Sequence, residues 1–258
     1  MVAPMQQHVK TAQLNPQPAR NLAGLQDALN RPYLFVHINK CGGTSVASAL
    51  GLMPFHASVQ KYITLVGRTR LQSRRVFTVV RRPYERLCSL YRYRLKRGKA
   101  CFEGRTLDLN EWVYRALQSC DPAVTLSPDM IKPAHNWLVD EEGTEHVELV
   151  VRLEEIDAGW PQIQRFTGSD AALPWENTTG ATPDTSTEAL SRESRDIIER
   201  VFHKDFDSYC YDRIRTRPFA GRLPVWASPQ SNLSLAPASG LLYRNPSLGP
   251  NPPRIRVE

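Results

Sequence analysis

Between residues 32 and 216, short apolar runs alternate with stretches in which apolar side chains recur every three or four positions. The runs 33–38, 76–80 and 146–151 are typical of strands that are buried in a parallel sheet. Helical spacing recurs in five segments: after Gly43, from Pro83, and at 109–117, 154–166 and 187–202. This alternation predicts an α/β fold with a central parallel sheet flanked by helices.

The two ends of the chain lack this pattern. Residues 1–31 carry only a short amphipathic stretch, and residues 217–258 hold eight of the twenty prolines. We therefore expect a flexible N-terminal extension at 1–31, one folded domain at 32–216 and a Pro-rich, poorly ordered tail at 217–258. Apolar residues make up 41% of the chain, which excludes a wholly disordered protein.

The composition also bears on location and on metal sites. No window of the chain approaches the ~18 consecutive apolar residues of a membrane span, and the first thirty residues lack the apolar segment of a signal peptide. We therefore expect a cytoplasmic protein without a transmembrane segment. The five cysteines contain no C-x-x-C pair, which favours reduced thiols over a disulfide framework or a zinc site. Nothing in the pattern indicates an oligomeric state.

The net charge of +7 is distributed unevenly. Residues 61–105 contain fourteen basic side chains and two acidic ones, whereas residues 106–216 contain ten basic and twenty-two acidic side chains. A basic stretch of this kind forms either a solvated surface or a surface that attracts anions. It carries no recognised nucleic-acid-binding motif, so we expect no nucleic-acid partner.

The first candidate site is the segment FVHINKCGGTSV (35–46). Its order of strand, tight loop and helix start is one in which backbone N–H groups can hold an anion. Gly42 and Gly43 let the backbone approach a ligand closely, and Lys40 adds a positive charge. In the pattern G-x-x-x-x-G-K-[ST] the lysine follows the glycines, whereas Lys40 precedes them. The segment therefore predicts that the single domain is P-loop-like, with a loop that differs from a standard ATP loop.

A second candidate anion site follows the next predicted strand. The segment VVRRPYERLCSLYRY (79–93) runs from a strand into a helix, with Arg81 at the strand end and Ser89 eight residues later. An arginine and a hydroxyl can both donate hydrogen bonds to one anion. Two such sites at neighbouring strand ends suit a ligand that carries two separated phosphates.

These two segments resemble two motifs of one enzyme family. Segment 35–46 resembles the 5′-phosphosulfate loop F-x-H-x-P-K-x-G-G-T-S, and 79–91 resembles the 3′-phosphate motif R-[DN]-P-x-x-R-x-x-S-x-Y. Both motifs belong to sulfotransferases that use 3′-phosphoadenosine 5′-phosphosulfate (PAPS), in particular the carbohydrate O-sulfotransferase branch with the heparan sulfate 2-O enzymes. Weaker similarity extends the resemblance over roughly residues 33–212. Since no anchor segment is found, a bacterial-type cytosolic member fits best.

The resemblance implies transfer of a sulfuryl group from PAPS to an acceptor hydroxyl by in-line displacement, without a metal. It also implies that Lys40 neutralises the leaving oxygen and that Arg81 and Ser89 bind the 3′-phosphate. The residues implied in holding the 5′-phosphosulfate are Lys40, Cys41, Gly42, Gly43, Thr44 and Ser45. The acceptor hydroxyl is expected on a carbohydrate or a glycolipid.

His56 is the candidate catalytic base. It lies between the two motifs, where the resemblance places the base, and a neutral imidazole accepts a proton near pH 7. A structural or substrate-contacting role is the alternative for His56. His135 is the rival base, although packing or acceptor binding also fits it, and His37 lies within a predicted strand as a core histidine would.

The chain departs from the family motifs at two positions. Asn39 stands where proline is usual, and Arg82 stands where Asp or Asn is usual, which adds a charge beside the 3′-phosphate motif. We expect Arg86 to tie the helix to the sheet. Arg152 and Glu154 either form an internal ion pair or line the cofactor site.

Two other functions remain open at this point. A phosphoryl-transfer enzyme with an atypical phosphate loop would need Mg²⁺ and carboxylates near the loop, and residues 35–60 contain no carboxylate. A non-enzymatic polyanion-binding protein would use residues 61–105 and bind in a strongly salt-dependent way. Four basic residues after the second motif either contact an acidic acceptor or form a solvated helix end: Lys96, Arg97, Lys99 and Arg105.

Overall fold

The computed structural model describes residues 17–125, 127–174 and 180–214 of the chain. Its central sheet has three parallel strands in the order β1 (Tyr33–Val36), β2 (Arg75–Val80) and β5 (Leu149–Arg152). Val36 pairs with Thr78, and Val80 pairs with Arg152, so the carboxyl ends of all three strands lie at one edge of the sheet. The expected α/β fold with a parallel sheet is confirmed, and the single P-loop-like domain stays a prediction.

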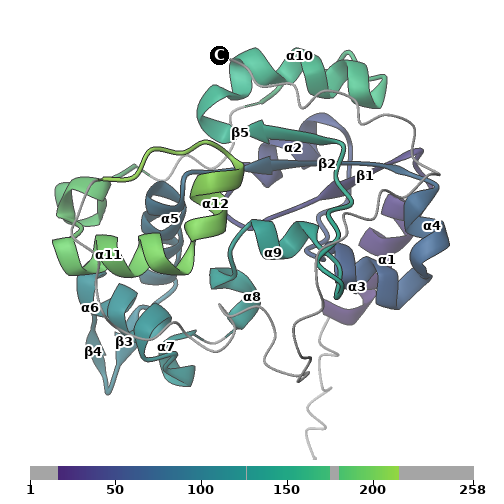
Figure 1. The fold of residues 1–258 in the computed structure, drawn as a ribbon. Coiled ribbons are helices and arrows are strands. Elements are labelled where there is room, and N and C mark those ends of the chain that lie inside the picture. Colours follow the sequence, from purple (N-terminus) through teal and green to yellow (C-terminus); the bar gives the residue numbers. More distant parts are fainter. Residues whose placement is uncertain (1–16, 126, 175–179, 215–258) are drawn as a thin grey trace, which may run out of the picture.

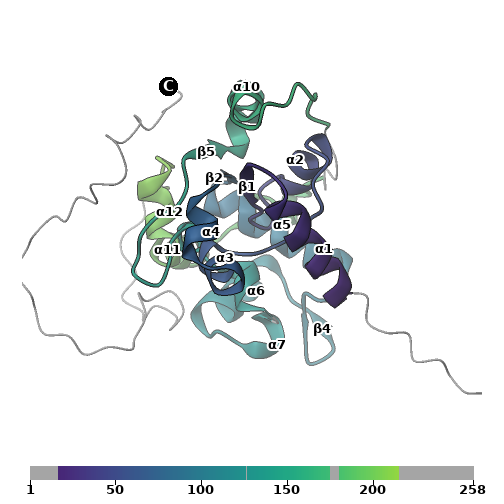
Figure 2. The same cartoon turned by 90° about the vertical axis from the view of Figure 1, so that its right-hand side faces the viewer.

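The sheet is covered on both faces because successive strand residues point to opposite sides. One core lies between the sheet and the helices α2 (Gly43–Ala49) and α10 (Ile156–Thr167), and its strand residues are Tyr33, Phe35, Phe77, Val79, Leu149 and Val151. The larger core lies on the other face, and its strand residues are Leu34, Val36, Val76 and Val80. Figures 1 and 2 both show α10 on one side of the sheet and α6 and α7 far out on the other.

Each of the two candidate segments crosses this edge from a strand into a helix. Strand β1 leads through a short loop into α2, and β2 leads through Arg81 and Arg82 into α5 (Pro83–Lys96), where Pro83 occupies the first helical position. The remaining elements are α1 (Gln17–Leu29), α3 (Val59–Val66), α4 (Arg68–Gln72), β3 (Cys101–Phe102), β4 (Arg105–Thr106), α6 (Leu109–Val113), η1 (Tyr114–Gln118), α7 (Pro122–Thr125), α8 (Pro128–Ile131), α9 (His135–Leu138), η2 (Leu153–Glu155), η3 (Pro183–Thr185), η4 (Thr187–Ala189), α11 (Arg192–Val201) and α12 (His203–Ser208).

Several predicted elements differ in their bounds, and three of them differ most clearly. The strand expected at 146–151 is β5, and it begins only at Leu149. The helix expected at 187–202 is divided: a short 3₁₀ turn is followed by an extended Ser191, whose side chain accepts the backbone N–H of Ser194 and so begins α11. The segment 109–117 is α-helical at first and then continues as a π-helical turn. Apolar spacing alone therefore located these elements without defining their ends.

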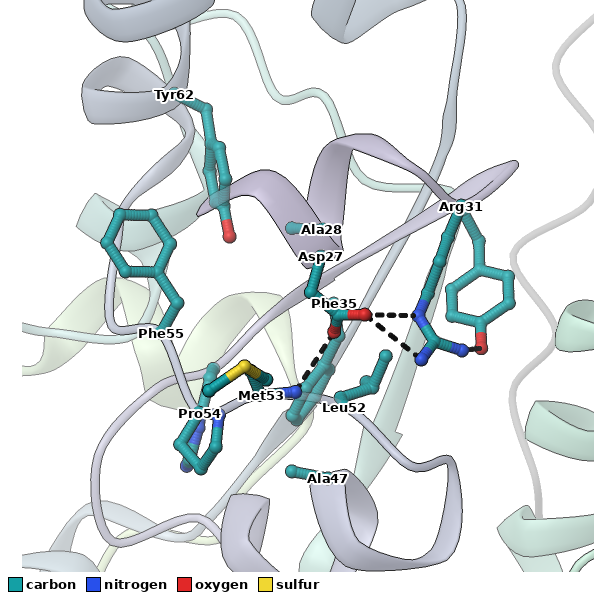
Figure 3. A pocket seen from close by; sticks show the side chains of 12 residues that line it. Asp27, Ala28, Arg31, Phe35, Ala47, Leu52, Met53, Pro54, Phe55 and Tyr62 are labelled. Carbon is teal, nitrogen blue, oxygen red and sulfur yellow. Dashed lines mark hydrogen bonds and ion pairs between the residues drawn. The ribbon is translucent and has the colours of Figure 1, made fainter. Parts of the chain in front are cut away.

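Part of the expected N-terminal extension is folded against β1. Helix α1 lies within residues 1–31, and Asp27 near its end accepts the backbone N–H of Met53 at 3.0 Å and pairs with Arg31 at 3.2 Å (Figure 3). Arg31 also donates to the carbonyl oxygen of Gly51 at 2.7 Å. Between α1, β1 and residues 52–55 there remains a cavity of about 20 Å³, which has room for about one water molecule. Residues 1–16 and the predicted tail at 217–258 lie outside the described residues.

The contact between α10 and β5 provides a test of this packing. A Cβ added at Gly159 would lie 2.3 Å from Cγ1 of Val151. The stiff, β-branched valine cannot rotate away freely. The energetic cost of this overpacking should therefore exceed the ~1 kcal/mol of stabilisation that Ala in place of Gly provides through its higher helix propensity.

Accordingly, Gly159→Ala should lower the free energy of unfolding by about 1–2 kcal/mol in a urea titration. Gly180→Ala is the control, because an added Cβ there meets nothing within 4 Å. Equal stability of the two variants would contradict the packing described for α10.

Candidate anion-binding site

The two motif segments meet at the carboxyl edge of the sheet. Thr78 in β2 donates its hydroxyl to the carbonyl oxygen of Val36 at 2.8 Å, which joins the two strands just before their loops. Beyond them, Nη1 of Arg81 lies 3.4 Å from the carbonyl oxygen of Lys40, to which it donates. Lys40 and Arg81, which are forty-one positions apart in the sequence, therefore belong to one site.

The loop after β1 requires its two glycines. Gly42 has φ 72°, a left-handed conformation that favours glycine, and a Cβ there would lie 2.5 Å from Cδ1 of Leu153 in η2. A Cβ at Gly43 would lie 2.0 Å from the imidazole of His37. Lys40 also has a positive φ of 63°, which is uncommon for a residue with a side chain. The surrounding elements thus hold the backbone of this loop in a close turn.

The site contains a group of positive charges. Burial lowers the pKa of Lys40, and the nearby guanidinium groups of Arg81 and Arg92 lower it further. Burial is also the main cause of a lowered pKa of Arg92, with a contribution from Arg81. Across the parts of the chain that the structure describes, none of these three residues forms an ion pair with a carboxylate. The three cations repel one another, and an anion bound between them would relieve that repulsion.

The ammonium of Lys40 also lies over an aromatic ring. Its Nζ is 4.8 Å from the ring centroid of Tyr93, a residue of α5. The guanidinium carbon of Arg97 is 5.1 Å from the same centroid. Such cation–π contacts hold a charge in place without neutralising it. Lys40 is therefore oriented by α5 while its charge stays available to a ligand.

The other residues expected to hold the phosphosulfate differ in exposure. Cys41 is buried, and burial raises the pKa of its thiol to about 11, so it can offer a ligand only its backbone. Thr44 is exposed at the first turn of α2, and Ser45 is buried behind it. Ser89 is buried in α5, one helical turn before Arg92. No hydrogen bond joins Ser89 to Lys40 or Arg81 among the described residues.

Asn39 and Arg86 explain how the loop is held without the usual proline. Arg86 is buried in α5, and its Nε and Nη2 donate to the backbone and side-chain oxygens of Asn39, both at 3.2 Å. The amide of Asn39 in turn donates to the carbonyl oxygen of Asp129 at 3.2 Å. Arg86 also donates to the carbonyl oxygen of Lys132 at 2.9 Å. Arg86 therefore ties α5 to the loop after β1 and to the chain after α8, instead of directly to the strands.

Glu154 occupies the amino end of α5. Its Oε1 accepts the backbone N–H of Arg82 at 2.8 Å, and its Oε2 accepts the hydroxyl of Tyr211 at 3.1 Å. Arg152 pairs with Glu155 and not with Glu154, so of the two alternatives for Arg152 and Glu154 the internal ion pair does not form. The carboxylate of Glu154 thereby fixes the turn between β2 and α5 and joins it to the end of the described chain.

His56 lies close to His37, with 4.1 Å between their ring centroids. Nδ1 of His56 is 2.9 Å from the carbonyl oxygen of His37. Because a carbonyl oxygen only accepts, Nδ1 must carry the hydrogen, and Nε2 of neutral His56 is left unprotonated. His56 is exposed overall, but desolvation of its imidazole lowers the pKa, and this effect outweighs the hydrogen bond to the His37 carbonyl oxygen, which raises it.

His135, the rival base, lies in a different environment. Its pKa is lowered by burial and by the neighbouring Lys204 and His203 of α12. The buried Asp205 accepts the backbone N–H groups of Ala134 and His135 at 2.7 and 2.8 Å. Burial raises the pKa of Asp205 to about 6. This contact places the start of α9 against α12, and the charges that act on His135 come from α12.

The four basic residues after the second motif do not form one cluster. Arg105 pairs with Glu111 at 2.5 Å, whereas Arg97 lies over Tyr93. Lys96 and Lys99 are exposed. Within the described residues, no group of three or more His, Cys, Asp or Glu side chains is placed to hold a metal ion.

Comparison with known proteins identifies the family. The profile of the sulfotransferase family matches residues 31–212, which is more than half of the chain. The chain belongs to the sulfotransferase family. No curated protein and no solved structure matches it. Family membership makes the protein an enzyme of sulfuryl transfer to a hydroxyl-bearing acceptor. Within the described residues of this sulfotransferase, no helix is long and apolar enough to span a membrane, and the cytoplasmic location stays a prediction.

The sequence did not indicate two residues that the structure adds to the candidate site. Leu153, which directly follows β5, packs against Gly42. The order of the strands in the sheet brings it there, and this order cannot be read from the local sequence. Arg92 joins Lys40 and Arg81. Arg92 follows Ser89 by three residues on a predicted helix, so both lie on one face of it. This spacing was the sequence signal that could have added Arg92 to the candidate site.

The buried His37 makes stability depend on pH. Burial, with a contribution from His56, lowers its pKa from 6.5 to about 3, so the folded state holds this imidazole neutral. A group of this kind stabilises the fold above the pKa of the unfolded chain, and its contribution is lost as the pH falls from 6.5 toward 3.

The free energy of unfolding should therefore fall between pH 6.5 and 4, with a slope from this group that approaches about 1.4 kcal/mol per pH unit. Denaturant titrations of the wild type and of His37→Gln across this range measure the slope. The variant should show a shallower one, and identical slopes would contradict a buried, neutral His37.

Proposed function

We propose that the protein transfers the sulfuryl group of PAPS to a hydroxyl of a carbohydrate or glycolipid, with His56 as the base. One observation carries the proposal. Lys40 and Arg81, from the two segments that resemble the donor-binding motifs, meet at the carboxyl edge of the sheet without a carboxylate partner in the described chain. Buried or half-buried cations of this kind are typical of a site for phosphate and sulfate groups.

The proposed donor suits the residues present. PAPS supplies an activated sulfuryl group on its 5′-phosphate and a separate 3′-phosphate. The close turn at Gly42 and Gly43 brings backbone N–H groups near Lys40, which suits the 5′ end. Arg81, in the loop that follows β2, and Ser89, on α5, suit the 3′-phosphate. The match to the sulfotransferase family favours this donor over the ATP of a phosphoryl-transfer enzyme.

The role of His56 follows from its tautomer. Its Nδ1–H is held by the carbonyl oxygen of His37, so Nε2 can accept the proton of the acceptor hydroxyl. The lowered pKa keeps the imidazole neutral near pH 7, and a base must be neutral to act. The contact with His37, which lies three residues before Lys40, supports this role because it joins the ring of His56 to the chain that leads into the proposed phosphate loop.

The step is balanced by these two side chains. The acceptor oxygen forms a bond to sulfur while the bond between sulfur and the 5′-phosphate oxygen breaks, and the electron pair of that bond stays on the phosphate. The proton moves to Nε2 of His56, and the ammonium of Lys40 neutralises the charge that develops on the leaving oxygen. The resemblance to carbohydrate O-sulfotransferases supports a glycan or glycolipid as the source of the hydroxyl.

Nucleotide binding tests the donor site. Arg81→Met should weaken the binding of adenosine 3′,5′-bisphosphate by about 10- to 100-fold, because charge-assisted hydrogen bonds are lost. Isothermal titration calorimetry measures both affinities. Arg105→Met is the matched control, because Arg105 belongs to the same basic stretch but pairs with Glu111. An equal loss in both variants would favour diffuse polyanion binding, and the absence of wild-type binding would refute the donor site.

The base is tested by separating turnover from binding. His56→Asn keeps a donor that can reach the carbonyl oxygen of His37 but has no basic nitrogen. Its kcat should fall by about 10²- to 10⁴-fold, while its affinity for adenosine 3′,5′-bisphosphate changes little. Turnover is followed by mass spectrometry on glycans and glycolipids, first screened with the wild type. His135→Asn should retain its kcat, and the reverse result would make His135 the base.

A further inference from the structure

Arg92 is the member of the cation group that neither motif includes. It lies on α5, is half-buried, and its Nη1 donates to the carbonyl oxygen of Thr185 at 2.6 Å. Its Nε is buried without a hydrogen-bond partner among the described residues. The anchor at Thr185 therefore fixes the guanidinium but neutralises none of its charge.

The position of Arg92 links it to the 3′-phosphate motif. Arg92 follows Ser89 by three residues on the same helix, so both lie on one face of α5. Electrostatic repulsion from Arg81 and Arg92 acts on Lys40, and repulsion from Arg81 acts on Arg92, so the three charges are mutually close. Holding a third positive charge here costs free energy unless a ligand compensates for it.

We propose that Arg92 binds the 3′-phosphate of the donor nucleotide together with Arg81 and determines the preference for nucleotides that carry this group. This inference rests on the function proposed above. A phosphate monoester carries close to two negative charges at pH 7, whereas each unit of the 5′-phosphosulfate carries about one. Arg81 supplies one positive charge and Ser89 none, so Arg92 supplies the second charge that a dianion requires.

The Thr185 anchor gives this residue a fixed direction. Thr185 lies in η3, where its hydroxyl and that of Thr182 form a capping box that closes the turn. One terminal nitrogen of Arg92, Nη1, is bound to this turn, and the other terminal nitrogen, Nη2, would be the donor to the phosphate. A lysine at this position would keep the charge but could not make both contacts at once.

The test compares two nucleotides that differ only in the 3′-phosphate. Arg92→Met should weaken the binding of adenosine 3′,5′-bisphosphate by about 10- to 100-fold, and the binding of adenosine 5′-phosphate by less than about 3-fold. The affinity of Arg92→Lys for adenosine 3′,5′-bisphosphate should lie between that of the wild type and that of Arg92→Met. Arg165→Met, which removes an exposed charge on α10, is the control and should bind both nucleotides as the wild type does.

A purely structural role predicts a different result. If Arg92 only held α5 to Thr185, Arg92→Met would lower the thermal unfolding temperature and weaken the binding of both nucleotides equally. That result would overturn the inference. Unchanged affinities would overturn it as well. A wild-type protein that does not prefer the 3′,5′-bisphosphate would instead refute the proposed donor, so the two failures are distinguishable.

A second measurement reports the effect of the Arg92 charge on the pKa of Lys40. Because Arg92 helps to lower the pKa of Lys40, that pKa should rise in Arg92→Met but not in Arg165→Met. The pH dependence of acetylation at Lys40, followed by peptide mass spectrometry, measures this change. An unchanged profile in Arg92→Met would place Arg92 too far from Lys40 to belong to the same site.

Discussion

Mutual repulsion among Lys40, Arg81 and Arg92 is the physical constraint on which this site depends. The three charges come from two loops and one helix, and a parallel sheet brings those elements together at the carboxyl ends of its strands. Placing the cations together without carboxylate partners in the described chain lowers the stability of the free protein. The same arrangement gives an anion a favourable place to bind, so a loss in stability and a gain in affinity have one cause.

The rest of the site holds these charges in position. The backbone of the first loop lies against His37 and Leu153, which leave no room for a Cβ at Gly43 or Gly42. Arg86 joins α5 to Asn39, so the helix that carries Arg92 and the loop that carries Lys40 are fixed to each other. Such rigid placement is what a transfer reaction requires, because the electrostatic groups must be in position before the charge develops.

Short-range patterns predicted much of this structure, and long-range contacts account for the rest. The apolar run at 76–80 and the spacing after Pro83 located β2 and α5, because burial and helix periodicity are local properties of the sequence. The motif spacing likewise selected Lys40 and Arg81 as candidates, and the structure brings these two residues into contact. By contrast, the tautomer of His56 depends on a carbonyl nineteen residues away, and the anchor of Arg92 lies ninety-three residues away in η3. No periodicity encodes such contacts.

A crystal structure of the protein with adenosine 3′,5′-bisphosphate would show directly whether the group of Lys40, Arg81 and Arg92 binds the donor nucleotide. We expect the 5′-phosphate to lie within hydrogen-bond distance of Lys40 and of the loop at Gly42 and Gly43. We also expect Arg81 and Arg92 to bind the 3′-phosphate, while Thr185 still accepts a hydrogen bond from Arg92. A nucleotide bound away from this edge of the sheet, or a 3′-phosphate that contacts neither arginine, would contradict this expectation.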